Sequence, residues 1–144
     1  MSIKLKLDGF EDLLTQIEKA GGTIDSAATK CLKKSADIMD TELRKQMQAA
    51  NVDSDLANSM PPPEIEVEGN RYTARVGYKK GNYNPDNPSD GYKIVFLNYG
   101  TPHRTKHGKV AARGFIKKAK KKATPQIKKA QTETLNKILG GLNG

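Results

Sequence analysis

Three consecutive prolines, Pro61-Pro62-Pro63, separate two adjacent segments of this 144-residue chain that have different hydrophobic periods. Each proline lacks a backbone amide donor, and the residue before a proline resists helix, so a helix ahead of this run must end before it. Apolar residues in the segment just ahead of the prolines, over about residues 24–47, recur every three or four positions, as in a helix. Those in residues 65–78, just after the prolines, alternate as in strands. The length predicts one domain, residues 1–144, that combines both kinds of element.

The amino-terminal segment predicts a short strand followed by a helix. Residues 2–7 read S-I-K-L-K-L, in which apolar and polar side chains alternate as on a strand with one buried face. Asp8 and Glu11 have the spacing of a capping box, so we expect a helix over about residues 9–20. Gly21-Gly22 would end it.

A second, long amphipathic helix is expected from Thr23 or Asp25 to about Ala50. Either residue is a good helix N-cap. The apolar stripe of this helix is thin and rich in small residues, so we expect it to lie closely across a sheet while much of its circumference meets water or another subunit. Cys31 lies on this stripe and is interpreted as a packing residue.

Three further strands are expected after the prolines. Residues 65–78 alternate around Gly69-Asn70, which predicts a β-hairpin. Residues 79–91 are rich in Gly, Pro and Asx residues and predict a long loop. Residues 92–99, Y-K-I-V-F-L-N-Y, form the most apolar run of the chain and predict a strand at the centre of the sheet, covered on both faces.

Two helices are expected at the carboxyl terminus, after a loop at residues 100–110. The first would run over about residues 111–123, and Thr124-Pro125 resembles the start of a second that Gly140-Gly141 ends. The order β-α-α-β-β-β-α-α predicts the α+β class, with an antiparallel sheet of about four strands and helices packed on one face. No apolar run is long enough for a membrane span, and we expect no signal peptide.

Positive charge is concentrated in the last third of the chain. The formal net charge is +9, but residues 1–100 carry a net −2, and residues 101–144 carry 12 Lys and Arg against Glu133 alone. The densest part is the basic run of Lys117, Lys118, Lys120, Lys121 and Lys122. This run is a solvated helix face, a contact for nucleic-acid phosphates, or a contact for an acidic protein. Few aromatic residues accompany it, so any DNA contact is expected to be nonspecific.

The sequence contains no recognisable catalytic or cofactor-binding constellation, so we expect neither enzyme activity nor a cofactor. His103 and His107 are four residues apart, but Pro102 and Gly108 bracket them in a loop, which favours two solvated histidines over a metal site. A single cysteine excludes an internal disulfide and a CxxC metal knuckle. Glu64, Glu66 and Glu68 share the strand face opposite Ile65 and Val67, which indicates an exposed edge or an acidic interface.

Two short motifs give the chain a family resemblance. Phe96, Leu97, Tyr99, Gly100 and Thr101 fit a pattern F-L-x-[FY]-G-T, and Ala112, Arg113, Phe115, Ile116 and Ala119 fit A-R-x-F-[IL]-x-x-A. Leu56 with Ser59-Met60 is similar to a further segment of the same family. Together these motifs resemble the neck and tail-completion, or head–tail joining, family of long-tailed bacteriophages and prophages. Gly114 stands where the family commonly has proline, and Asp55 where it commonly has glycine.

The resemblance implies a structural protein without catalytic groups. It implies a small α+β subunit that assembles into a ring, expected to be a hexamer, between the capsid connector and the tail tube. Its partners would be other copies of itself and the neighbouring neck, connector and tail-tube proteins, with possible DNA contact in the channel and no membrane. It would be found in the host cytoplasm during assembly and then at the head–tail junction of the virion.

Interface residues are expected in the acidic strand, the long loop and the two motifs. The candidates for an oligomer or partner interface are Glu64, Glu66, Glu68, Tyr83, Tyr99, Thr101, Arg113 and Phe115. The lysines of the basic run are the candidates for contact with DNA or an acidic partner. The alternative function is a free, basic, nonspecific nucleic-acid-binding protein that uses this run.

Overall fold

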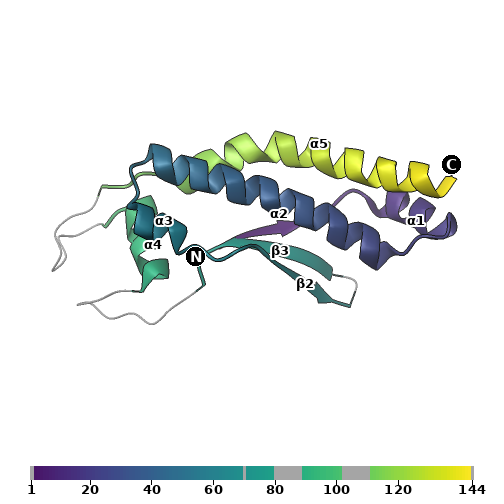
Figure 1. Ribbon diagram of the computed structural model, residues 1–144, viewed down its shortest axis with the longest axis horizontal. Coiled ribbons are helices and arrows are strands. Elements are labelled where there is room, and N and C mark those ends of the chain that lie inside the picture. The colour runs from purple at the N-terminus through teal and green to yellow at the C-terminus, as the bar shows by residue number, and fades with distance from the viewer. Residues whose placement is uncertain (1, 70, 80–88, 102–110, 144) are drawn as a thin grey trace.

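Helix α2 (Ile24–Ala49) is the middle layer of the molecule. In the computed structural model, which describes residues 2–69, 71–79, 89–101 and 111–143, a β-sheet lies on one side of α2 and helix α5 (Phe115–Asn143) on the other (Figure 1). Helix α1 (Glu11–Lys19) packs near the start of α2. The short helices α3 (Ser54–Asn58) and α4 (Asp90–Tyr99) lie at the opposite end.

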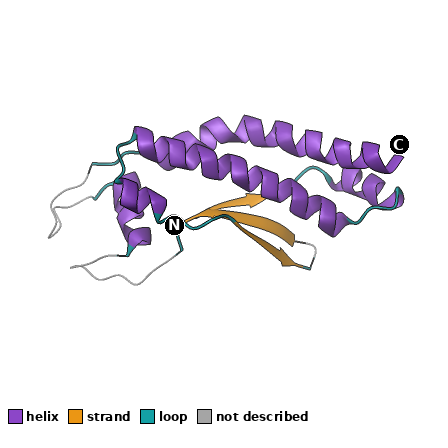
Figure 2. Ribbon diagram, in the orientation of Figure 1, coloured by secondary structure: helices purple, strands orange, loops and turns teal. Residues whose placement is uncertain are grey.

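The sheet is antiparallel and has three strands, in the order β1 (Ser2–Lys6), β3 (Arg71–Gly77) and β2 (Glu64–Glu68). Its inner face carries Ile3, Ala74 and Val76, which are buried against the helices, whereas Lys4 and Arg75 on the outer face are exposed. The α+β class with helices on one face of an antiparallel sheet is therefore confirmed (Figure 2). The first strand and the hairpin are also as predicted, but the described sheet has three strands rather than four.

The predicted central strand over residues 92–99 is wrong, because this segment forms α4. Its buried residues are Gly91, Ile94 and Asn98, which are three and four positions apart and so share one face of a helix. Ser89, in extended conformation, precedes the helix, and Asp90 places a negative charge in its first turn. The run contains many strand-forming residues, but burial of one face of a helix outweighs this local preference.

Helix α5 is continuous, so the predicted break at Thr124-Pro125 and the stop at Gly140-Gly141 are wrong. Pro125 lies inside the helix and is exposed, so the carbonyl that lost its amide partner can bond to water. The hydroxyl of Thr124 donates to the carbonyl of Lys120 at 2.7 Å. Buried residues on both sides of the proline, among them Ala119, Ala123 and Ile127, form one stripe that keeps the helix on α2.

The two amino-terminal helices lie close to their predicted ranges. Thr23 caps α2 as expected, because its hydroxyl accepts a hydrogen bond from the amide of Ser26. Asp8 does not cap α1: the N-cap residue is Phe10, which provides no side-chain hydrogen bond. The capping-box interpretation is therefore wrong, and α1 is held by Ile17 and its apolar neighbours. α2 is covered on two sides, by the sheet and by α5, and its remaining face, which carries Lys33, Lys34 and Lys45, is exposed, as expected.

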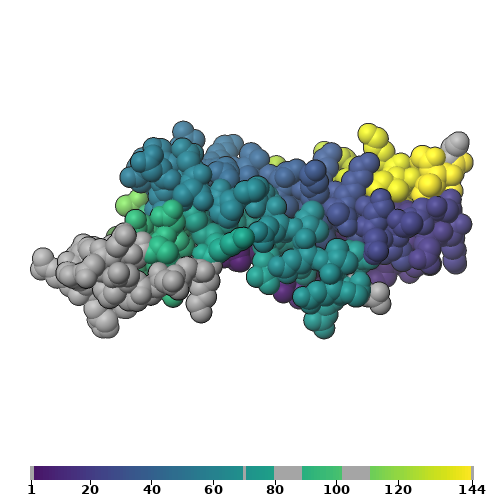
Figure 3. Space-filling view, turned by 60° about the horizontal axis from the view of Figure 1, so that its bottom comes forward, coloured from purple at the N-terminus to yellow at the C-terminus, as the bar shows by residue number. Residues whose placement is uncertain are grey.

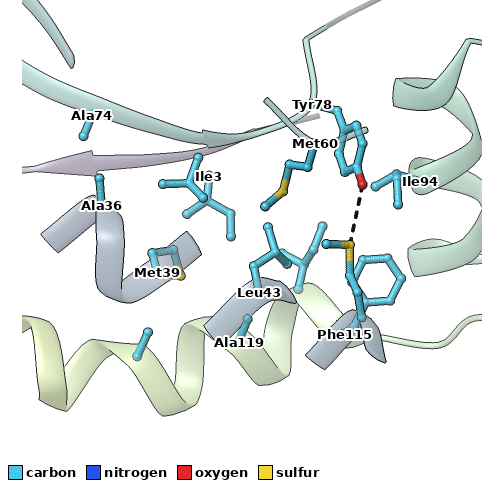
Figure 4. Packing of buried hydrophobic residues seen from close by; sticks show 14 of the residues in the cluster. Ile3, Ala36, Met39, Leu43, Met60, Ala74, Tyr78, Ile94, Phe115 and Ala119 are labelled. Atoms are coloured by element: carbon cyan, nitrogen blue, oxygen red, sulfur yellow. Dashed lines mark hydrogen bonds between the residues drawn. The ribbon is translucent and has the colours of Figure 1, made fainter. Parts of the chain in front are cut away.

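The main core fills the space between the sheet, α2 and α5. Figure 4 shows Ile3 and Ala74 of the sheet facing Ala36 and Met39 of α2, with Ala119 of α5 beyond them. At the far end of this core, the hydroxyl of Tyr78 donates to the carbonyl of Leu56 at 2.6 Å. The small side chains let the three layers approach closely.

A buried polar contact sets how α2 and α5 align along their length. The side-chain amide of Gln131 donates to the hydroxyl of Ser35 at 3.1 Å, and that hydroxyl donates to the carbonyl of Cys31 at 2.9 Å. These groups lie among apolar residues, so a shift of one helix along the other would leave the side-chain amide of Gln131 without its partner on α2.

Replacement of Leu32, a fully buried residue of α2, by alanine is expected to destabilise the protein by about 2–5 kcal/mol, because it leaves a cavity between tightly packed helices. Urea unfolding followed by circular dichroism measures the loss. The control is Leu142→Ala near the end of α5, where the side chain is 39% exposed, and the expected change is within about 0.5 kcal/mol. Equal losses in the two variants would contradict the layered core.

Candidate assembly surfaces

The two motifs of the family resemblance meet at one junction. The end of α4 and the segment before α5 lie together, because the amides of Arg113 and Gly114 donate to the carbonyls of Leu97 and Asn98, each at 3.0 Å. The side-chain oxygen of Asn98, which is buried, accepts from the amide of Ile116 at 3.0 Å. This bond satisfies one of the free amides at the start of α5, in the way that an N-cap residue does.

Arg113 joins the same junction to the end of α2. One guanidinium nitrogen donates to the carbonyls of Ala50 and Asn51, both at 3.2 Å. A cation at the carboxyl end of a helix is favourable, because the last carbonyls carry partial negative charge. Three helices, α2, α4 and α5, are therefore connected through the motif residues, and we define this region as the motif junction.

Gly114 stands where the family that the motifs resemble commonly has proline. Its φ is +60°, in the left-handed region. Proline, whose ring holds φ near −65°, cannot adopt this angle, so the residue common in the family does not fit the backbone that this chain has at the start of α5.

The predicted interface residues of the motifs divide into buried and exposed ones. Phe115 is 1% exposed and Thr101 is buried, so both belong to the interior of the subunit. Tyr99 is 65% exposed at the end of α4 and is the large apolar side chain that the junction presents to its surroundings. Tyr83 lies outside the described residues, as do most of the predicted loop 79–91 and residues 102–110 of the second loop, with both histidines.

The predicted acidic residues lie on the outer face of edge strand β2. Lys79 pairs with Glu64 at 2.9 Å and Arg75 pairs with Glu66 at 3.6 Å, and Glu68 is exposed opposite Arg71. The side chains of β2 and β3 project from the lower half of the molecule in Figure 3. The acidic row thus forms an exposed edge, as predicted, but β3 places cations beside it.

Lys4 and Lys6, on the opposite edge strand, were not among the predicted site residues. Both are exposed on the outer face of β1, and Lys4 lies directly opposite Arg75 of β3. The strict alternation of residues 2–7 places them together in the sequence, but only the strand order shows that one edge of the sheet is basic and the other acidic.

All five lysines of the basic run are exposed on α5. α2 carries further exposed lysines: Lys30, Lys33 and Lys34 line one open groove together with Gln126 of α5. Asp37 and Glu42 line this groove as well, so it is basic at one end and mixed at the other.

Two buried ionisable side chains, those of Cys31 and Tyr78, are held in their neutral forms. Burial raises the pKa of the Cys31 thiol to about 11, which keeps it protonated and is consistent with a packing role. Burial likewise raises the pKa of Tyr78 to about 12. Within residues 2–69, 71–79, 89–101 and 111–143, no group of three His, Cys, Asp or Glu side chains could hold a metal ion.

Comparison of the chain with family models, with curated proteins and with solved structures gave no match. Of the helices in the described part of the chain, none combines the length and the apolar character needed to cross a membrane.

Replacement of Asn98 by alanine is expected to destabilise the protein by about 1–3 kcal/mol, because the buried amide of Ile116 loses its partner. Thermal and urea unfolding measure the effect. Asn136→Ala, at an exposed position of α5, is the matched control and should leave stability within about 0.5 kcal/mol. A wild-type stability for Asn98→Ala would contradict the structural role of the motif junction.

Proposed function

We propose that this chain is a structural subunit of the head–tail junction of a long-tailed phage or prophage. In this role it assembles into a ring, expected to be a hexamer, that joins the connector to the tail tube. It binds proteins rather than transforming a substrate, and it needs no cofactor. It works first in the host cytoplasm and then in the neck of the virion.

The observation that carries this proposal is the motif junction. The two motifs on which the resemblance rests are separated along the chain, yet their residues bond to one another and to the end of α2. The two motifs therefore form one structural unit. A structural role for the motif residues supports a protein that works by assembly and not by catalysis. The same unit presents Tyr99 at the end of the molecule.

The distribution of charge also supports assembly through different surfaces of the same subunit. A heterologous interface joins two different patches and closes into a ring when the rotation between subunits permits it. Exposed charge pairs contribute only about 0–1 kcal/mol each, so buried apolar contacts must supply most of the affinity. Charge then determines register and the rate of encounter.

The purified chain is expected to form rings in negative-stain electron microscopy and to bind the connector and tail-tube proteins encoded beside it. Tyr99→Asp should weaken this binding at least about tenfold, because the exposed ring is an apolar anchor whose loss removes contact area from an interface. Size-exclusion chromatography with light scattering and pull-down with the two neighbouring proteins measure both properties.

The matched control is Leu142→Asp, which changes another exposed apolar side chain at the opposite end of the molecule. It should bind the neighbouring proteins as the wild type does. A chain that stays monomeric and binds neither neighbour would argue decisively against the proposed function.

Nonspecific nucleic-acid binding is the second candidate function, and the exposure of the whole basic run on α5 favours it. Its affinity should fall with salt, and each lost phosphate contact should lower the slope of log affinity against log salt by about one. A variant that replaces four lysines of the run by glutamine is expected to lose most duplex binding. The four are Lys117, Lys118, Lys120 and Lys121.

A matched variant replaces four exposed lysines elsewhere by glutamine and should keep duplex binding. These are Lys19, Lys45, Lys79 and Lys93. Fluorescence anisotropy with a labelled duplex at several salt concentrations compares the two variants. Unchanged binding by the variant in the basic run would exclude this second function.

A further inference from the structure

Both edges of the sheet are open in the described part of the chain. The order β1-β3-β2 leaves β1 and β2 with one neighbour each. No backbone hydrogen bond joins either strand to any described segment other than β3. An edge strand with free amides and carbonyls is a template for pairing with a further strand.

The two edges carry opposite charge on the same face of the sheet. Lys4 and Lys6 project from the outer face of β1, and Glu64, Glu66 and Glu68 from the outer face of β2. Within the described residues neither lysine forms an ion pair, and Lys4 lies opposite the like charge of Arg75. Like charges directly across a strand pair are unfavourable. Lys4 lines a small hollow of the outer face together with Glu66, Glu68 and Arg75, but no carboxylate of the described residues pairs with it.

The inner face of the sheet has matching apolar features at the two edges. Val67 of β2 is 49% exposed, although it points to the same face as the buried core residues. Beside β1, an open groove is lined by the apolar residues Leu5, Phe10, Met39 and Ile127. Its polar lining residues are Lys6, Asp8, Thr124, Lys128, Gln131 and Thr132. An apolar residue on a strand added to β1 would therefore have a place to be buried.

The directions and lengths of the strands fit this pairing. β1 and β2 are both antiparallel to β3, so they run parallel to each other, and each has five residues. When β2 of one copy is placed parallel to β1 of another with Lys4 beside Glu66, Lys6 falls beside Glu68 and Leu5 beside Val67. Charged side chains then meet on the outer face and apolar ones on the inner face.

We propose that β2 of one copy of this chain pairs in parallel with β1 of a second copy, so that the sheet continues from subunit to subunit. The contact is heterologous, because each copy uses its acidic edge toward one neighbour and its basic edge toward the other. The pairing is inferred from the two edge strands alone, whereas its closure into a ring is inferred from the proposed function.

Charge reversal at either edge tests the pairing. Lys4→Glu with Lys6→Glu makes both edges acidic, and Glu66→Lys with Glu68→Lys makes both edges basic. Each double variant alone is expected to self-associate at least about tenfold more weakly than the wild type, because two attractive pairs become repulsive. Analytical ultracentrifugation over a range of protein concentrations measures this.

An equimolar mixture of the two double variants is expected to recover association, because every acidic edge then meets a basic edge of the other variant. Recovery in the mixture cannot arise from damage to either fold, and it distinguishes pairing from a general loss of stability. A mixture that stays as weak as its components, or a wild type that remains monomeric at all concentrations, would overturn the inference.

Val67→Asp provides a test with little effect on the fold, since this side chain is half exposed in the subunit. It places a carboxylate in the apolar groove of the neighbouring copy and should weaken association at least about tenfold. Lys33→Glu with Lys34→Glu, on the exposed side of α2, is the matched charge control and should associate as the wild type does. Wild-type association of Val67→Asp would contradict the proposed register.

These outcomes are separate from those of the proposed function. If the charge reversals weaken self-association but the chain binds neither connector nor tail-tube proteins, the pairing is supported and the neck role is excluded. If the chain binds those proteins and neither charge reversal changes its self-association, the neck role is supported and the pairing is excluded.

Discussion

Packing of α2 between the sheet and α5 is the contact on which the remaining structure depends. The sheet has only three strands and buries one face, and α5 buries one stripe, so neither has a core without α2. The hydrogen bond from Gln131 to Ser35 adds a directional requirement to this apolar contact. Apolar burial supplies most of the stabilisation, and the buried polar pair specifies one alignment of the helices.

The motif junction provides hydrogen-bond partners for backbone groups at the helix ends, which have none within their own helices. The end of α2 and the start of α5 lie close together, and each has free carbonyls or amides. Arg113 donates to the carbonyls at one end, and Asn98 accepts from an amide at the other. Arg113 and Asn98 therefore have a structural role in this chain, since each satisfies a backbone group on a different helix.

The surfaces that remain for function differ in chemistry. The outer sheet face is charged with opposite signs at its two edges, α5 carries a continuous lysine surface, and Tyr99 is an exposed aromatic at one end. Such a subunit can contact two neighbouring copies through its edges and still offer α5 and α4 to other partners. This division is consistent with the proposed ring, whose subunits would contact one another and also the proteins above and below them.

Local pattern was sufficient where burial follows a simple period. The alternation of residues 2–7 and 65–78 predicted the three strands. Apolar residues three and four positions apart, such as Leu13, Leu14 and Ile17 or Ala28, Cys31 and Leu32, predicted the first two helices. The exposure of the lysines on α5 also followed from helical spacing, and the acidic row of β2 from strand spacing. In these segments one face is polar, so the sequence itself shows which face is buried.

Tertiary structure decided the remaining features. Residues 92–99 have strand-forming side chains on every face, and their helix is selected because Ile94 and Asn98 are buried together on one side. Pro125 fits within α5 because its neighbours on the buried stripe keep contact with α2. Three other features depend on residues that are distant in the chain. They are the buried position of Phe115, the bond between Asn98 and Ile116, and the opposite charges of the two sheet edges. Such pairings depend on the spatial order of strands and helices, which no local period contains.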